Sequence, residues 1–264
     1  MPLLGAILLT IGTLIVVVPT RDGVVIVADS KLSRRTTAGA PTGTGVTEKV
    51  FSLPGVPGTA FFVTGITPVE WLPDGGTIAT VVDARGLVTA RLSHRGDVSR
   101  ARFDALADEA ARIAGRINRM GDLAAALTGR ELFSVVMVKT SGGTHDVASF
   151  VVRLTASGAS VSERTWEPFA QSSAARVMMF GEGAFVGAGL PRWPGGSAEC
   201  ARRFLASGRR RVADVTHETA ARGGYSILEA ASIAMGEDGA VGPPFRTYLL
   251  TQTLTELRPP PPCR

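Results

Sequence analysis

Two short apolar runs separated by a single turn constrain the fold of this chain more than any other feature. The first run covers residues 14–18 (Leu-Ile-Val-Val-Val) and the second covers 24–28 (Val-Val-Ile-Val-Ala). Residues 20–23 between them (Thr-Arg-Asp-Gly) have the composition of a turn. Because neither run alternates apolar with polar residues, each is typical of a strand buried on both faces. We therefore predict a buried β-hairpin near the start of the chain.

The composition indicates one domain. The chain has 264 residues, of which 45% are hydrophobic, so a single domain can bury a sizeable core. Pro and Gly are scattered between short apolar runs, and no stretch has the composition of a linker. We expect one domain over residues 13–257 and a disordered Pro-rich tail over 258–264. Residues 1–12 are interpreted as a propeptide or as the remnant of a signal sequence.

Charge and hydropathy argue against two classes of partner. The chain carries 28 Lys and Arg against 23 Asp and Glu, a net charge of +5. Its only compact basic run, 209–211, has no interleaved aromatic residue to stack on bases, so we expect no nucleic-acid partner. The apolar stretch 1–18 is short for a membrane span and is ended by Pro19, so we expect no stable membrane span.

The same stretch bears on localisation. It lacks the basic start and the small-residue cleavage site of a secretory signal, so we expect a cytoplasmic protein. The alternative is an exported or periplasmic protein, if residues 1–12 are part of a signal sequence.

Cysteine and histidine usage indicates neither a metal site nor a disulfide framework. Cys200 and Cys263 are two cysteines far apart in the chain, and we expect Cys200 to be packed in a helix. His94, His145 and His217 each lack a second ligand at metal-binding spacing. No Gly-Lys-Ser/Thr phosphate loop occurs either. We therefore predict no metal and no cofactor.

Periodicity predicts further strands and helices. A second pair of strands at 49–53 and 59–63 surrounds a Pro- and Gly-rich turn, so the first quarter of the chain is predicted to form one four-stranded β unit. An amphipathic helix is predicted over 103–120. The remaining predicted elements are strands at 132–138, 147–154, 177–180 and 245–251 and helices at 198–207 and 227–235. This order is typical of an α+β fold of two stacked sheets with helices outside.

Three polar residues stand at the ends of the predicted strands. Thr13 opens the first apolar run, Asp29 follows the second, and Lys49 begins the next strand. If Thr13 became a new N-terminus, its hydroxyl would be a nucleophile and its α-amine, with a pKa of about 8, a base. A lysine ammonium nearby would lower the pKa of that hydroxyl, and Asp29 would keep a buried Lys49 charged. These are the parts needed for amide-bond chemistry.

The order of these residues resembles a known family. Gly12-Thr13, the segment 22–30 (Asp-Gly-Val-Val-Ile-Val-Ala-Asp-Ser), 48–51 (Glu-Lys-Val-Phe) and 63–65 (Val-Thr-Gly) resemble the start of proteasome β-subunits and their bacterial threonine-protease relatives. These belong to the N-terminal nucleophile (Ntn) hydrolase superfamily. The resemblance implies the four-layer αββα sandwich of that superfamily. The extra residues 39–43 before Lys49 are expected to form a loop.

The resemblance also implies roles for individual residues. The bond between Gly12 and Thr13 would be cleaved by the chain itself, and Thr13 would then be the nucleophile. Asp29 and Lys49 would be its charge pair, and the backbone N–H of Gly65 would be the oxyanion donor.

The resemblance extends to the substrate. Ser33 would present an edge strand to an extended substrate peptide, whose backbone would pair with it.

Two later motifs depart from the family pattern. Residues 180–183 (Phe-Gly-Glu-Gly) resemble a Gly-Ser-Gly turn beside the threonine, with Glu182 in place of the serine. Asp238 and the segment 241–243 (Val-Gly-Pro) resemble the family's Asp and Ser-Gly-Gly segment, with Val241 in place of the serine. Two supporting hydroxyls are therefore missing from the expected places, and Glu182 is a candidate for an alternative acid or base.

These features leave two functions open. The first is an autoprocessed threonine hydrolase that cleaves a peptide or small amide through an acyl-threonine intermediate. The alternative is a catalytically inactive, proteasome-like subunit with a role in assembly. Since the superfamily includes ring-forming members, we expect a homo-oligomer. Segment 68–91, where a substrate pocket would be lined, matches no known pattern, so the sequence does not define specificity.

Overall fold

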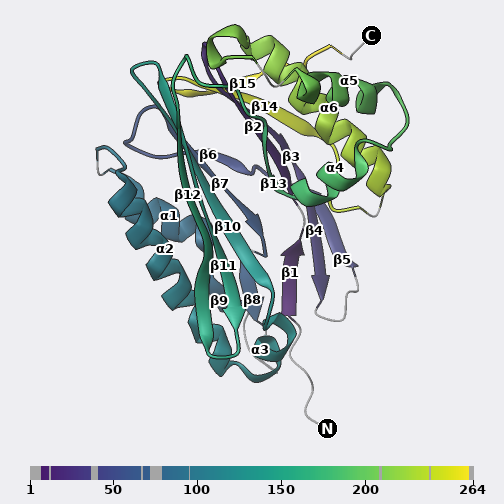
Figure 1. Cartoon of the computed structure of the whole chain (residues 1–264). Helices are drawn as coiled ribbons and strands as arrows, with labels where there is room; N and C mark the ends of the chain where they lie inside the picture. Colours follow the sequence, from purple (N-terminus) through teal and green to yellow (C-terminus); the bar gives the residue numbers. More distant parts are fainter. Residues whose placement is uncertain are drawn as a thin grey trace.

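The structure is a computed structural model of the chain (Figure 1). It describes residues 7–11, 13–36, 41–66, 68–71, 79–94, 96–207, 210–237 and 239–261. Within these ranges only the backbone is described at 7–11, 32–36, 41–44 and 71. Three antiparallel five-stranded sheets and several helices make up the described part, so the fold is of the α+β class.

The predicted first hairpin is confirmed, and it lies at the centre of a sheet. Strands β2 (Leu14–Thr20) and β3 (Gly23–Asp29) pair antiparallel, and every residue of both strands is buried. Sheet B has the order β13 (Met178–Gly181), β2, β3, β14 (Phe245–Leu250) and β15 (Leu254–Leu257). The strands that flank the hairpin thus come from the second half of the chain.

The predicted second hairpin is also confirmed, but it belongs to another sheet. Strands β6 (Val50–Ser52) and β7 (Thr59–Gly65) pair at one edge of sheet C. Its other strands are β10 (Glu131–Ser141), β11 (Thr144–Thr155) and β12 (Gly158–Phe169). The predicted four-stranded β unit is therefore wrong, because β7 pairs with β10 rather than with the first hairpin.

A smaller sheet, sheet A, contains the residues that precede Thr13. Its order is β5 (Pro41–Val46), β4 (Lys31–Thr36), β1 (Ile7–Ile11), β8 (Val69–Trp71) and β9 (Ala79–Val82). Figure 1 shows β1 beside β4 at the end of the molecule where the N-terminus lies. The prediction of a loop at 39–43 is wrong for residues 41–43, because they belong to β5, which pairs with β4. Residues 39 and 40 lie outside the described part.

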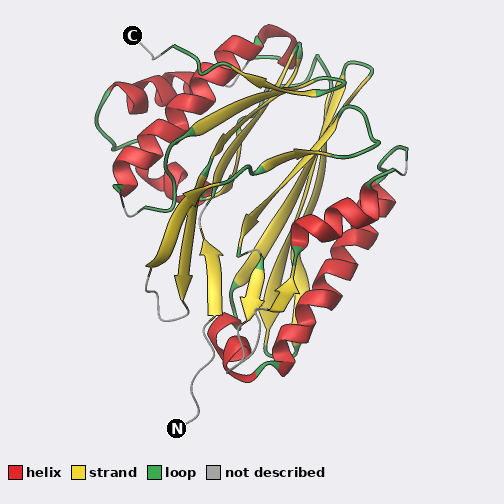
Figure 2. Cartoon of the chain, turned by 180° about the vertical axis from the view of Figure 1, so that it is seen from behind, coloured by secondary structure: helices red, strands yellow, loops and turns green. Residues whose placement is uncertain are grey.

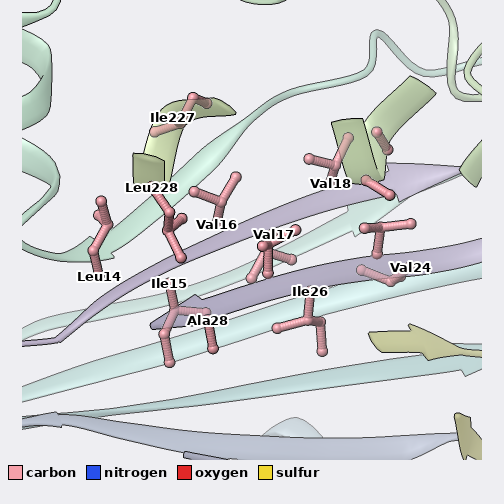
Figure 3. Packing of buried hydrophobic residues seen from close by; sticks show 14 of the residues in the cluster. Leu14, Ile15, Val16, Val17, Val18, Val24, Ile26, Ala28, Ile227 and Leu228 are labelled. Carbon is pink, nitrogen blue, oxygen red and sulfur yellow. The ribbon is translucent and has the colours of Figure 1, made fainter. Parts of the chain in front are cut away.

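One group of helices packs on sheet B. The longest, α6 (His217–Met235), contacts β2, β3 and β14, and α5 (Gly196–Ala206) packs on α6. Ile227 and Leu228 of α6 lie over the valines of β2 and β3 (Figure 3). The approach is close at Gly224, where an added Cβ atom would lie 2.7 Å from a methyl group of Val27. The short helix α4 (Gly183–Gly189) lies on the same side (Figure 1), and the 3-10 helix η2 (Val212–Asp214) contacts β2.

A second group of helices packs on sheet C, on the opposite side of the molecule (Figure 2). It contains α1 (Ala84–Leu92), α2 (Arg100–Ala114), η1 (Gly115–Arg119) and α3 (Gly121–Leu127). The predicted helix over 103–120 is confirmed as far as Ala114, where α2 ends and η1 follows, and Phe103, Leu106 and Ala110 are buried toward the sheet. Phe62, Val136 and Val138 of sheet C belong to the same core cluster as β2, β3 and the buried face of α6, so sheets B and C also pack on each other.

Two details differ from the sequence predictions in this half of the chain. Helix α6 begins at His217, ten residues before the predicted 227, with Thr216 as its N-cap. Cys200 is 7% exposed on α5, as predicted, but it is disulfide-bonded.

Within the described ranges, no helix is both long and apolar enough to cross a membrane.

Candidate active site

The carboxylate of Asp29 contacts both the backbone at the start of β2 and the side chain of Lys49. Asp29 is the last residue of β3, and the antiparallel pairing of β2 with β3 brings it beside the start of β2. Its Oδ1 accepts a hydrogen bond of 2.8 Å from the backbone N–H of Leu14, the residue after Thr13. Its Oδ2 lies 2.8 Å from Nζ of Lys49, which immediately precedes β6. One carboxylate therefore links the backbone next to Thr13 to a lysine from the other large sheet.

This ion pair is buried. The side chain of Asp29 is 0% exposed and that of Lys49 is 7% exposed. Burial raises the pKa of Asp29 and lowers the pKa of Lys49, because each charge loses its hydration; the opposite charge of the partner acts against both shifts.

The turn over residues 181–183 lies against Thr13. Strand β13 pairs with β2 so that Gly181 is opposite Leu14, and the backbone N–H of Glu182 donates a 3.0 Å hydrogen bond to the carbonyl oxygen of Thr13. Gly181 has a φ of +79°, and an added Cβ atom there would overlap that same oxygen. The Glu182 contact is made by its backbone, and its carboxylate is half-buried at the start of α4.

Gly65 is the last residue of β7 and follows Thr64, which approaches this turn. It has a φ of +93°, and an added Cβ atom would lie 2.6 Å from the carbonyl oxygen of Leu132, so the position requires glycine. The preceding residue, Thr64, is 3% exposed and approaches Gly181. Its hydroxyl shares a 2.6 Å hydrogen bond with the hydroxyl of Ser134 on β10.

The Thr64–Ser134 hydroxyl pair was not predicted from the sequence. It lies close to Gly181, since a Cβ atom added there would lie 3.6 Å from Cβ of Thr64. Thr64 and Ser134 are far apart in the chain, and only the register between β7 and β10 places them opposite each other. Predicting the pair would therefore have required that register to be known. The pair therefore supplies two hydroxyls on strands next to Gly181, while the turn over 181–183 has none.

Val241 lies in a segment that is held by Lys31. Nζ of Lys31 donates hydrogen bonds to the backbone carbonyls of Glu237 and Gly239, the latter at 2.7 Å. The N–H of Ser30, next to Asp29, donates to the carbonyl of Pro244 at 3.0 Å. Val241 itself is fully buried, so an apolar residue is suited to its surroundings. Lys31 thus positions this segment, a role that the sequence did not indicate.

The strand before Thr13 lies between two other strands. β1 pairs antiparallel with β4, where Ile11 is opposite Ser33, and with β8 on its other side. The backbone of Ser33 therefore pairs with the residue two positions before Thr13, as an edge strand would pair with an extended peptide. The side chain of Ser33 is not described.

Two predicted site residues lie outside the described residues: Gly12, on the proposed cleavage bond, and Asp238. In the part of the chain that is described, no three His, Cys, Asp or Glu side chains are grouped as a metal site would require. No protein-family model matches this chain, and no curated protein matches its sequence.

Proposed function

We propose that this chain is an N-terminal threonine hydrolase of the Ntn superfamily, cleaved between Gly12 and Thr13. The observation that carries the proposal is the position of Asp29, which binds the backbone beside Thr13 and the ammonium of Lys49 at the same time. A carboxylate in this position holds a cation close to the residue that would become the N-terminus. Burying a lysine ammonium costs free energy unless a carboxylate compensates for the lost hydration, as Asp29 does for Lys49.

The proposed architecture is the four-layer αββα sandwich of that superfamily. It is supported by α6 packing on sheet B, by α2 packing on sheet C, and by the core that the two sheets share. The threonine at the start of a central strand, with the carboxylate at the end of its hairpin partner, fits the arrangement expected for this superfamily.

The proposed reaction uses groups of this chain and one water molecule. The Thr13 hydroxyl attacks the carbonyl carbon of Gly12, the bond to the Thr13 nitrogen breaks, and an ester forms on the Thr13 oxygen. Water hydrolyses the ester and leaves a carboxylate on Gly12 and a free amine on Thr13. That amine then acts as the base when the hydroxyl attacks a substrate amide, and the backbone N–H of Gly65 stabilises the oxyanion. This chemistry needs neither a metal nor a cofactor.

The proposed substrate is an extended peptide. Before cleavage, β1 approaches Thr13 as a strand paired on both sides, by β4 and by β8. A substrate peptide in the same place would gain main-chain hydrogen bonds without a strong demand on its sequence. A small amide that reaches Thr13 without filling the strand position is the other substrate class.

The alternative is a catalytically inactive, proteasome-like subunit that acts in assembly. It is favoured by the absence of a hydroxyl at Glu182 and at Val241, the latter being buried in the core. A homo-oligomer remains part of either proposal. Its support is the exposure of two apolar side chains, Val46 at 59% and Ile233 at 69%, beside a cavity of about 530 Å³.

Localisation also remains a proposal. The expected cytoplasmic location and the exported alternative differ in redox environment, and the disulfide bond of Cys200 favours the exported alternative.

The test is the intact mass of the purified protein. A hydrolase loses residues 1–12 in the wild type, loses them more slowly as Thr13→Ser, and keeps them as Thr13→Ala. A wild-type chain that keeps these residues under all folding conditions would favour the assembly role. A fluorogenic peptide library added to the processed chain then separates an active enzyme from one that cleaves only itself.

A further inference from the structure

The segment that processing would release is a structural part of sheet A. β1 is the middle strand, with four register pairs to β4 and three to β8. In the strand order of this sheet, the β4–β5 hairpin and the β8–β9 hairpin are joined only through β1. Removing β1 would leave two strand edges facing each other without a partner.

Cleavage between residues 12 and 13 leaves this pairing in place. Among the described residues, every register pair of β1 involves residues 7–11, all on the N-terminal side of the bond that is cut. Hydrolysis breaks a covalent bond and adds one water, but it removes no backbone pairing from either side of the strand. What the released segment loses is the high effective concentration that the covalent bond gave it.

The released segment also lies where a substrate would lie. Ile11 is opposite Ser33 on β4, and the next two residues are Gly12 and Thr13. A second extended peptide cannot pair with β4 and β8 while β1 occupies the place between them. The segment is itself rich in apolar residues (Ile7, Leu8, Leu9 and Ile11), so water does not strongly favour its release.

We propose that the slot between β4 and β8 is a binding site for the chain's own residues 1–12 after cleavage, and that this peptide is a competitive inhibitor of the processed enzyme. This inference rests on the proposed function for its inhibitory role. The binding itself depends only on the sheet.

The first experiment compares two mass measurements on the processed protein. Under denaturing conditions the chain begins at Thr13. Under native conditions the complex has the mass of the unprocessed chain plus one water, because the peptide is still bound. A native mass of the shortened chain alone, at micromolar concentration, would overturn the proposal.

The second experiment does not require catalysis. Leu9 pairs with both Arg35 and Val69, so Leu9→Pro removes a backbone N–H from the centre of β1 and weakens its pairing on the strand. In the full-length Leu9→Pro chain the tethered β1 is held less tightly than in the wild type, so an excess of a fluorescent synthetic peptide of residues 1–12 displaces it and binds the slot saturably. A peptide carrying the same Leu9→Pro change binds about tenfold more weakly. Equal binding of the two peptides would show that strand pairing is not responsible.

The kinetic consequence is a third readout. In processed wild-type enzyme, added residue 1–12 peptide raises KM for a peptide substrate and leaves kcat unchanged. An unchanged KM would contradict the inhibitory role. Failure of the proposed function has a different signature: residues 1–12 are never cleaved off, yet the labelled peptide still binds the Leu9→Pro chain. A thermal melt of that variant, compared with Leu9→Ala, checks that the fold is retained.

Discussion

An added Cβ atom on Gly181 would overlap the carbonyl oxygen of Thr13, the same oxygen that accepts the hydrogen bond from Glu182. The turn and the candidate nucleophile are therefore in direct backbone contact. A change in the turn must move Thr13, and this relationship makes Gly181 a sensitive test of the site.

We expect Gly181→Ala to slow cleavage between residues 12 and 13 by about a hundredfold, the usual effect of misplacing a reacting group by about 1 Å. The measurement is the rate of processing by intact mass. The matched control is Gly129→Ala, because Gly129 has a similar φ of +83° but nothing within 4 Å of an added Cβ atom. If both variants process at the same rate, backbone strain rather than contact with Thr13 is responsible.

Lys49→Ala should abolish processing and turnover. It leaves the carboxylate of Asp29 buried without its cation, which costs about 3–5 kcal/mol of unfolding free energy. Urea denaturation measures that cost and shows whether the chain still folds. Asp29→Asn in the same background relieves the unpaired charge and should recover stability but not activity. Retained activity in Lys49→Ala would remove the lysine from the proposed mechanism.

The alkaline limit of activity should depend on Lys49. Burial lowers its pKa, so it loses its proton at a lower pH than an ordinary lysine, whose pKa is about 10.4. Activity that needs the ammonium is present below the lowered pKa and is lost as the pH rises through it. In Lys49→Arg the guanidinium stays charged, so the alkaline limb moves to higher pH. An alkaline limb at the same pH in both proteins would contradict the role given to the ammonium.

His145 should make the folded chain less stable in mild acid. Its Nε2 is hydrogen-bonded at 2.9 Å to the carbonyl of Thr20, and its buried Nδ1 has no hydrogen-bond partner among the described residues. Burial lowers its pKa, while the Thr20 carbonyl and the charge of Asp146 act in the opposite direction. The unfolded chain therefore binds the proton more tightly.

The sign of this effect follows from linkage. The stabilisation is present above the unfolded pKa of about 6.5 and is lost as the pH falls through the lower folded pKa, by about 1.4 kcal/mol per unit of difference. Urea unfolding at pH 7.5 and pH 5 measures it. His145→Gln, which retains a donor for Thr20, should lose less stability over this range than the wild type. Parallel losses would assign the effect to other groups.

Lys31 should position the segment over residues 236–244. Lys31→Met removes the donor to the carbonyls of Glu237 and Gly239, and we expect a loss of about 1–3 kcal/mol. Because Ser30 donates to Pro244 in the same segment, the Ser30 amide should exchange its hydrogen faster in the variant. Lys139→Met, which removes a different lysine ion pair with Asp97, is the control. Unchanged exchange at Ser30 would show that Lys31 does not hold the segment.

The elements predicted from the sequence are those with strong local signals. The β2–β3 and β6–β7 hairpins have β-branched runs and Gly-containing turns, and α2 has an apolar stripe, so each was identified. Strand β12 was missed because it is an edge strand with many exposed polar residues, held by its long pairing with β11. The first half of α6 was missed because it contains Gly223 and Gly224, which are unfavourable in isolated helices.

Within the candidate site too, the residues with local sequence signals were predicted and the contacts between distant segments were not. The spacing of Thr13, Asp29 and Lys49 was visible because these residues lie at the ends of adjacent local hairpins. The contact between the Gly181 turn and Thr13, and the hydroxyl pair of Thr64 with Ser134, depend on pairings between distant segments. A single sequence carries no local signal for such pairings. The same reason explains why sheet A, which joins residues before and after the first hairpin, was not predicted.

The close approach of Gly224 to Val27 has a consequence for how this protein tolerates change. Helix α6 can lie this close to the hairpin because Gly224 has no Cβ atom. Val27, which Gly224 contacts, is two residues from Asp29. Adding that carbon costs about 1–3 kcal/mol of overpacking and pushes the strand that carries the carboxylate. A screen of random variants for lost processing should therefore recover substitutions at Gly224, which lies on α6 and not on either strand of the hairpin. Such variants would be mistaken for unstable proteins unless folding and processing were measured in the same sample.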